Sequence, residues 1–188
     1  MPTLQRKSIR LKGYDYTTEG AYFVTIVTCN RESLFGDIHD GEMVLNDYGR
    51  IVESTWHDLV NHNSNIGLDE FVVMPNHVHG IIVIFEPVGA GSQPAREIGA
   101  GFSLRKERSG AQRTREPAPT RKSSLSEIVR QFKTFSARRI NALRGTPGVP
   151  VWQRNYYDHI IRSDRENEEV AAYIANNPAN WLMDSENL

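Results

Sequence analysis

The run from Phe71 to Phe85, FVVMPNHVHGIIVIF, places two histidines one residue apart inside an otherwise apolar stretch. The β-branched and aromatic residues on both sides of its Pro-Asn pair predict two strands with a turn between them. Side chains alternate between the two faces of a strand, so His77 and His79 point to one face and Val78 to the other. Because two imidazoles side by side can bind one divalent metal ion, this strand is a candidate metal site in a sheet.

The length and cysteine content limit the kind of protein that this chain can form. At 188 residues the chain can bury one core and is short for two, so we expect a single domain over residues 1–188. Cys29 is the single cysteine, which excludes a disulfide framework and a cysteine metal site. The N-terminus lacks the apolar core of a signal peptide and no run approaches membrane-spanning length, so we expect a soluble cytoplasmic protein.

The formal charge of −1 is unevenly distributed along the chain. Residues 95–144 carry 13 Lys and Arg against 4 acidic residues, an excess of nine positive charges that leaves −10 for the remainder. This polarity favours a face that binds an anionic polymer. Residues 88–123 are rich in Gly, Pro, Ser and Arg without a hydrophobic period, which predicts a flexible basic insert. The alternative is a solvated basic loop without a ligand.

Hydrophobic patterns predict the other elements of the domain. Strands are expected at 22–29, 42–45 and, as a strand or extended segment, at 151–162. Amphipathic helices are expected after the cap at Asn46 and after the Ser124 to Glu127 capping box. The order strand, helix, strand, strand, helix, strand is that of a ferredoxin-like (RRM-like) βαββαβ domain. We therefore predict an α+β fold, an antiparallel sheet with these helices on one face, followed by a C-terminal helix.

The C-terminal helix carries two polar residues on its expected docking face. A second capping box, Ser163 to Glu166, begins the helix, and Pro178 ends it near Asn177. Tyr173 and Asn177 are one helical turn apart and share a face with apolar residues that should contact the sheet. A buried amide is costly without partners, and a metal ion would be one such partner for Asn177.

A site made of His77, His79 and the amide oxygen of Asn177 would have Tyr173 one helical turn away. Nitrogen and oxygen ligands of this kind suit Mg²⁺ or Mn²⁺ bound to phosphate oxygens. A metal ion there could polarise a phosphodiester, which Tyr173 would attack as the nucleophile. The resulting phosphotyrosine would conserve the bond energy, so DNA could be rejoined without ATP.

The candidate DNA-binding residues are basic side chains of the N-terminal arm, of the helix after Ser124 and of the segment that follows it. They are Arg6, Lys7, Arg10, Arg130, Lys133, Arg138, Arg139 and Arg154. A helix with one apolar face and one basic face suits backbone phosphates. The alternatives are a solvated surface helix and an arm that packs on the edge of the domain.

Three runs, VVMPNHVHGIIV, WQRNYYDHIIR and EEVAAYIANNPANW, together resemble the REP-associated tyrosine transposases, a branch of the single-tyrosine HUH transposases. The N-terminal run KSIRLKGYDYTTEGAYFVTIVTCNRESLFG is similar to one subgroup of that family, and the resemblance covers nearly the whole chain apart from 88–123. It implies that His77 and His79 are the HUH pair, Tyr173 the nucleophile and Asn177 the third polar ligand. Asn177 is shorter than the glutamine of some transposing relatives.

The resemblance also implies an activity and a partner. Family members cut single-stranded DNA beside palindromic hairpins and leave a 5′-phosphotyrosine and a free 3′-hydroxyl. The expected partner is therefore single-stranded or hairpin DNA, and the protein is expected to be a monomer or homodimer associated with the nucleoid when bound. The long basic insert departs from the family pattern.

Two other functions are compatible with the same residues. One is a non-catalytic RRM-like module that binds single-stranded nucleic acid, with Tyr22, Phe23 and Phe71 as candidate stacking residues, although the RNP pattern is absent. The other is a metal-dependent hydrolase that uses water. Tyr156 and Tyr157 compete with Tyr173 as candidate nucleophiles.

Overall fold

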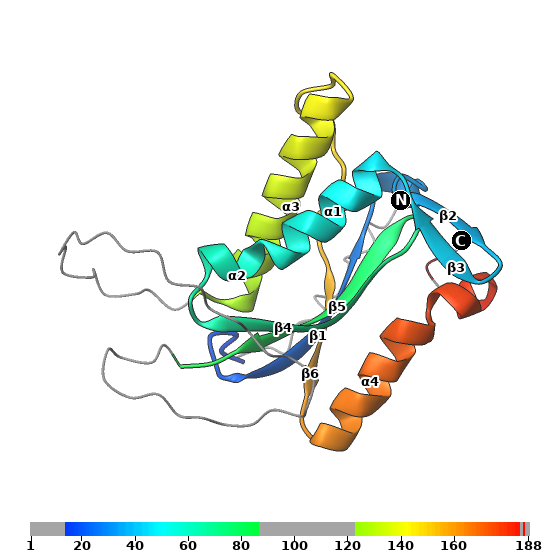
Figure 1. Ribbon diagram of the computed structural model, residues 1–188. Coiled ribbons are helices and arrows are strands. Elements are labelled where there is room, and N and C mark those ends of the chain that lie inside the picture. Colours follow the sequence, from blue (N-terminus) through cyan, green and yellow to red (C-terminus); the bar gives the residue numbers. More distant parts are fainter. Residues whose placement is uncertain (1–13, 87–122, 185, 187–188) are drawn as a thin grey trace, which may run out of the picture.

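The computed structural model describes residues 14–86, 123–184 and 186 (Figure 1). The strands are β1 (Gly20–Val27), β2 (Gly36–His39), β3 (Glu42–Leu45), β4 (Ile66–Val73), β5 (His77–Ile84) and β6 (Tyr157–Ile161). The helices are α1 (Asp47–His57), α2 (Leu59–His62), α3 (Leu125–Leu143) and α4 (Asp164–Asn176), with 3₁₀ segments η1 (Cys29–Arg31) and η2 (Pro178–Met183). No helix in these described ranges is long and apolar enough to cross a membrane.

Four strands form one antiparallel sheet in the order β4-β5-β1-β6, and β2 and β3 form a separate hairpin. Helix α1 connects β1 to β4 through the hairpin, and α3 lies between β5 and β6 in the chain. This is the ferredoxin-like order, so the predicted fold is confirmed. Figure 1 shows α1 and α3 on one face of the sheet and α4 on the opposite face.

The larger core lies between the sheet and the helices α1 and α3. Trp56 of α1 stacks on Phe71 with ring centroids 4.4 Å apart and meets the edge of Phe132 of α3 at 5.4 Å. Gly80 of β5 leaves the space for this ring, because a Cβ atom there would lie 2.4 Å from a Trp56 ring carbon. The position after the second histidine is therefore fixed by the packing of the core.

The opposite face of the sheet is covered by α4 over a smaller apolar cluster, formed by Phe23, Ile81, Ile161 and Ile174. The Ser163 hydroxyl accepts the Glu166 backbone N–H at 3.2 Å, as the predicted capping box requires. Helix α4 ends at Asn176, and η2 then brings Trp181 to a ring distance of 5.9 Å from His77. The chain end thus returns to the beginning of β5.

The last strand is shorter than the extended segment predicted for 151–162. The Lys133 ammonium donates hydrogen bonds to the carbonyls of Gln153, Arg154 and Asn155. These bonds hold the segment to α3, and Trp152 makes only an isolated bridge to Thr28. The N-terminal arm and the predicted insert, apart from Ser123, lie outside the described residues.

Candidate metal centre

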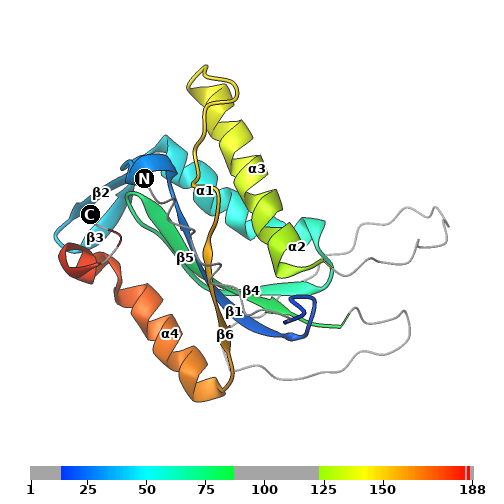
Figure 2. The same ribbon diagram turned by 180° about the vertical axis from the view of Figure 1, so that it is seen from behind.

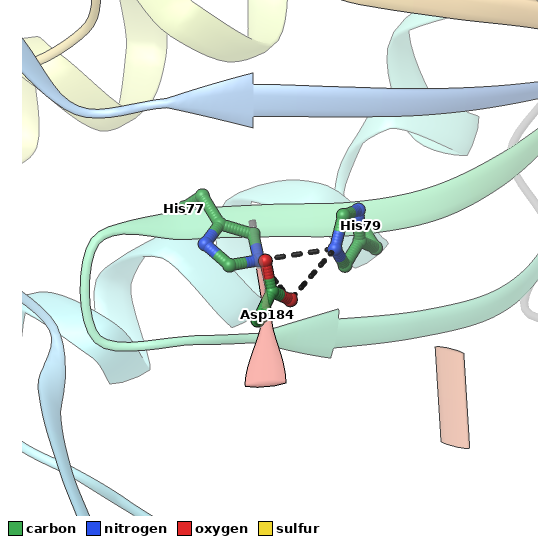
Figure 3. Close-up of side chains that lie close together, drawn as sticks. All are labelled: His77, His79 and Asp184. Carbon is green, nitrogen blue, oxygen red and sulfur yellow. Dashed lines mark hydrogen bonds and ion pairs between the residues drawn. The ribbon is translucent and has the colours of Figure 1, made fainter. Parts of the chain in front are cut away.

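Two histidines of β5 lie together on the face of the sheet that α4 covers (Figure 3). The side chain of His77 is fully buried and that of His79 is 3% exposed, with ring centroids 4.5 Å apart. Val78, between them in sequence, belongs to the larger core on the other face. The structure therefore brings the two rings to one face, as strand alternation predicts.

Each imidazole is held through its Nδ1 atom by a neighbouring side chain. His77 Nδ1 lies 2.8 Å from Asn76 Oδ1, and His79 Nδ1 lies 2.9 Å from Thr25 Oγ1. The Asn76 amide also donates its Nδ2 hydrogen to the Glu186 carbonyl at 2.7 Å, which agrees with Oδ1 accepting the His77 Nδ1–H. Partners of this kind fix ring orientation and leave Nε2 for a ligand.

The two Nε2 atoms of His77 and His79 converge at 3.0 Å. Burial, followed by the neighbouring His79, lowers the pKa of His77 to about 3, so this ring is neutral at neutral pH. A neutral imidazole with its Nδ1–H already donated presents a lone pair on Nε2. His77 therefore presents a nitrogen atom in the form that binds a metal ion, 3.0 Å from Nε2 of His79.

Asp184 completes a three-residue cluster that the sequence patterns did not predict. Its Oδ2 atom lies 3.8 Å from His77 Nε2 and 3.9 Å from His79 Nε2, and its side chain is 2% exposed (Figure 3). This oxygen has no hydrogen-bond partner among the described residues. Burial raises the pKa of Asp184, but His79, the Glu186 N–H and Asn177 outweigh it and hold the pKa below its usual range. Asp184 is therefore a buried carboxylate with one oxygen available for a cation.

The segment that carries Asp184 is fastened to the domain at Glu186. Arg31 forms an ion pair with the Glu186 carboxylate at 2.8 Å, and Asn76 binds the Glu186 carbonyl. The Glu186 N–H in turn donates to Asp184 Oδ1 at 2.6 Å. One oxygen of Asp184 is thus used to hold the segment, and the other faces the histidines.

Tyr173, in the last turns of α4, is the tyrosine that the structure brings to this cluster. Its Oη lies 3.4 Å from His79 Nε2, and its ring meets the edge of Phe23 at 6.1 Å. Burial, followed by the charge of Asp184, raises the pKa of Tyr173, against a smaller lowering by Asn177. Tyr173 is 48% exposed, so part of this residue faces solvent.

Asn177 is the C-terminal cap of α4 and is 2% exposed. Its Oδ1 atom is buried without a hydrogen-bond partner among the residues the structure describes. Asn177 acts on the pKa of both Tyr173 and Asp184, which places its side chain beside both groups. It therefore offers a second unpaired oxygen at the site, and its role as a ligand stays a prediction.

The donor set fits a divalent cation. Two buried nitrogens converge, and two buried oxygens, from Asp184 and Asn177, have no hydrogen-bond partner in the described ranges. Buried polar atoms without a partner are costly, and a cation among His77, His79 and Asp184, whose ligand atoms lie within 4.8 Å of one another, would satisfy them. Imidazole nitrogens together with a carboxylate oxygen suit a divalent metal ion.

Tyr156 and Tyr157, the other two candidate nucleophiles, lie just before β6 and at its first residue. Tyr156 packs against the larger core, on the α1 and α3 side. Tyr157 faces the α4 side, but in strand register it is paired with Thr25, which is paired with His79. Two strand spacings, about 10 Å, separate the backbones of Tyr157 and His79. Of the three candidates, Tyr173 is the one in contact with the histidine pair.

The predicted DNA-binding residues separate into groups with different surroundings. Arg130 donates to Glu127 at 2.9 Å, and Arg139 donates to Thr55 at 3.0 Å and to Asp58 at 3.1 Å. The Lys133 ammonium donates hydrogen bonds to the carbonyls of residues 153–155. Arg138 and Arg154 are exposed and have no carboxylate partner within the described ranges.

All of these described basic residues lie in α3 or in the segment just before β6, and α3 is on the face of the sheet opposite α4 (Figure 2). The structure therefore does not place them around the histidine pair. Arg6, Lys7 and Arg10 lie outside the described residues.

Known proteins resemble the chain both in sequence and in fold. No protein-family model matches the chain. The chain is 39% identical over 182 residues to an uncharacterized protein of Haemophilus influenzae. The aligned region covers 95% of this chain and 91% of that protein.

Among solved structures, the chain is similar to a REP-associated tyrosine transposase bound to a REP hairpin. The TM-score is 0.54 at 16% sequence identity, over 92% of this chain and 73% of that chain. It is also similar to a candidate transposase from Deinococcus radiodurans R1, with a TM-score of 0.44, 17% identity, and coverage of 89% of this chain and 95% of that chain. The first likeness agrees with the fold described above.

Proposed function

We propose that this chain, which belongs to the same family as the uncharacterized Haemophilus influenzae protein, is a metal-dependent single-stranded DNA endonuclease and strand transferase of the tyrosine transposase type. The observation that carries the proposal is the position of Tyr173 Oη, 3.4 Å from His79 Nε2 and beside the buried cluster of His77, His79 and Asp184. A hydroxyl nucleophile next to a candidate metal centre is what phosphodiester transesterification needs. The fold shared with a REP-associated tyrosine transposase supports the proposal by analogy.

In the proposed reaction, Tyr173 Oη attacks a phosphorus atom of the DNA backbone. The Oη–P bond forms as the P–O3′ bond breaks, so the 5′ phosphate remains on the tyrosine. The tyrosine loses its hydroxyl proton, and the 3′ oxygen leaves as a free hydroxyl that has gained one. A 3′-hydroxyl of another strand can reverse the step, and because the bond energy is conserved, ATP is not needed.

The residues of the chain would divide the work of this reaction. His77 and His79 would hold the metal ion, with Asp184, Asn177 or both as oxygen ligands. When bound, Mg²⁺ or Mn²⁺ would supply the positive charge that polarises the phosphate. The half-exposed ring of Tyr173 faces solvent on one side and Phe23 on the other, which limits where its hydroxyl can point.

The proposed substrate is single-stranded DNA beside a hairpin. The solved structure with a similar fold is bound to a REP hairpin, and the basic side chains of α3 and of the segment before β6 supply positive charge for phosphates in this chain. A protein that acts on chromosomal DNA in this way would work in the cytoplasm. We propose that it does so as a monomer or homodimer.

The non-catalytic RRM-like alternative is disfavoured by the surroundings of the aromatic residues that it would need. Tyr22 is fully buried and Phe23 is 9% exposed beneath α4. Phe71 is stacked on Trp56 in the larger core. These rings are used by the fold, so they do not form an open stacking surface for bases.

The test is to incubate the full chain with Mn²⁺ or Mg²⁺ and a labelled single-stranded hairpin oligonucleotide, and to look for a covalent adduct on a denaturing gel. We expect an adduct with the unmodified chain and none with Tyr173→Phe or with a chelator. Tyr157→Phe removes a competing hydroxyl and should keep the adduct. Cleavage that survives in Tyr173→Phe without an adduct would show a hydrolase that uses water. DNA binding without cleavage under either metal ion would favour the binding module.

A further inference from the structure

A second site lies away from the histidines, in a cleft between α3 and the segment 148–156. The cleft has a volume of about 750 Å³. Figure 2 shows that α3 and the segment leading into β6 run side by side here. Four basic side chains line the cleft, and the lining includes no acidic residue among those described: Arg130, Lys133, Arg138 and Arg154. The cleft is therefore an electropositive site of the size that binds organic ligands, roughly 300–1,000 Å³.

The basic residues of the cleft differ in how far the protein already uses their charges. Glu127 is bonded to Arg130, and the carbonyls at 153–155 are bonded to Lys133. Arg138 projects from α3 and Arg154 from the facing segment, and neither has a carboxylate partner within the described ranges. Two unpaired guanidinium groups, one from each wall, suit the phosphates of a chain that runs along the cleft.

Apolar side chains form part of the remaining lining. Val129, Ala137, Val149 and Pro150 contribute to the walls, and the Trp152 indole N–H is fixed by a 2.9 Å bond to Ser136 Oγ. A ligand with both phosphates and flat apolar faces matches this combination, and an unpaired polynucleotide strand has both. A duplex keeps its bases stacked inside and would leave the apolar walls without a partner.

The cleft reaches the edge of the sheet at β6, two strands away from β5, which carries the histidines. Asn155 and Tyr156 line it, and Tyr157, the next residue, begins β6 at the edge of the sheet. Tyr157 lies in the same cross-strand row as Thr25 and His79. The backbone of Tyr157, the residue after the cleft lining, is therefore about 10 Å from that of His79.

We propose that this cleft binds an unpaired segment of the DNA substrate, with phosphates on Arg138 and Arg154 and a base against the apolar part of the wall. The proposal rests on the proposed function for the identity of the substrate. In this proposal α3 holds the unpaired strand on the side of β6 that is remote from the scissile phosphate.

The test measures DNA binding without chemistry, by fluorescence anisotropy of the full chain in chelator. Two labelled oligonucleotides are compared, a hairpin with a single-stranded tail and the same hairpin without the tail. The variant is Arg138→Gln with Arg154→Gln. The control removes two charges outside the cleft, Arg50→Gln with Arg165→Gln, whose side chains are exposed and paired on other helices.

We expect the cleft variant to weaken binding of the tailed hairpin about tenfold or more. The slope of log affinity against log salt concentration should become shallower by about 0.7 for each phosphate that the variant no longer neutralises. Binding of the hairpin without a tail should change less than twofold, and the control should change both less than twofold.

Equal weakening for the two oligonucleotides, or weakening in the cleft variant no larger than in the control, would overturn the proposal. A chain that forms no adduct with metal, but whose cleft variant still binds the tailed hairpin more weakly, would refute the proposed function and leave the cleft intact.

Discussion

The two faces of the sheet differ in what their side chains do. The face toward α1 and α3 carries a continuous apolar core around Trp56 and Phe132, whereas the face toward α4 has a small apolar cluster beside the histidine pair. Strand β5 supplies both faces, because Val78 points into the core and His77 and His79 point to the site. One face therefore stabilises the fold, which leaves the other able to hold costly polar groups.

The largest expected effect comes from removing a metal-binding side chain from the α4 face. His77→Ala should slow adduct formation on the order of 1,000-fold, because a bound metal ion contributes several kcal/mol to stabilising the transition state. The protein should remain folded, since His77 lies outside the larger core. Single-turnover rates with a labelled hairpin and a urea titration measure the two quantities. A rate within tenfold of the unmodified chain would contradict the assigned role.

The opposite outcome is expected for the α1 and α3 face. Trp56→Ala should lower the free energy of unfolding by about 3–5 kcal/mol, because the ring is fully buried between Phe71 and Phe132. Urea unfolding measures this loss. Adduct formation per folded molecule should change less than about threefold. A variant that is fully folded yet as inactive as His77→Ala would show that the two faces are not separate.

The contributions of Asp184 and Asn177 sharpen the description of the α4 face. Asp184→Asn removes the carboxylate charge but keeps the shape of the side chain. We expect the Mn²⁺ affinity to fall about 100-fold, because even the loss of a residue that only hydrogen-bonds to a metal ligand lowers metal affinity about 10- to 100-fold. Isothermal titration with Mn²⁺ tests this, with Asn177→Ala measured in parallel. If Asn177→Ala alone weakens binding, the amide rather than the carboxylate is the oxygen ligand.

A smaller effect is expected for the threonine that orients His79. Thr25→Val keeps the side-chain shape but removes the 2.9 Å contact with Nδ1, and should weaken Mn²⁺ binding about tenfold. Thr55→Val is the matched control on the other face, where the hydroxyl bonds the Ile51 carbonyl within α1. Metal titration of both variants decides the point. Equal affinities in the two variants would mean that Thr25 does not position the ring.

The smallest effect compares the caps of the two long helices that follow the insert. Ser124 and Ser163 each accept a backbone N–H three residues later, at 3.3 Å and 3.2 Å. Each serine to alanine change should cost about 1 kcal/mol in urea unfolding. Only Ser163→Ala should also slow adduct formation, by a few-fold, because α4 carries Tyr173. A slower reaction in Ser124→Ala as well would argue for coupling through the sheet.

Much of the fold could be predicted because its signals are local. The alternation in β5, the apolar stripe of α1 and the capping boxes of α3 and α4 each depend on residues within a few positions of one another. The same local periods place His77 and His79 on one face and Tyr173 on the docking side of α4. Periodicity determines these placements, since it follows from backbone geometry alone.

Other features were decided by contacts between distant parts of the chain. Asp184 reaches the histidines because Arg31 and Asn76 hold Glu186, and no local pattern separates Asp184 from the acidic residues around it. The basic residues of α3 are equivalent in the sequence pattern. In the structure, however, Arg130 is bonded to Glu127, Arg139 to Asp58, and Lys133 to the carbonyls at 153–155.

The cleft depends on the same long-range contacts. Lys133 holds the segment before β6 beside α3, and this segment forms the second wall of the cleft. Local sequence patterns are sufficient for the strand and helix faces, and with them for the histidine pair and the tyrosine. The third ligand candidate and the unpaired arginines required the folded chain, because they depend on which distant groups satisfy each buried charge and carbonyl.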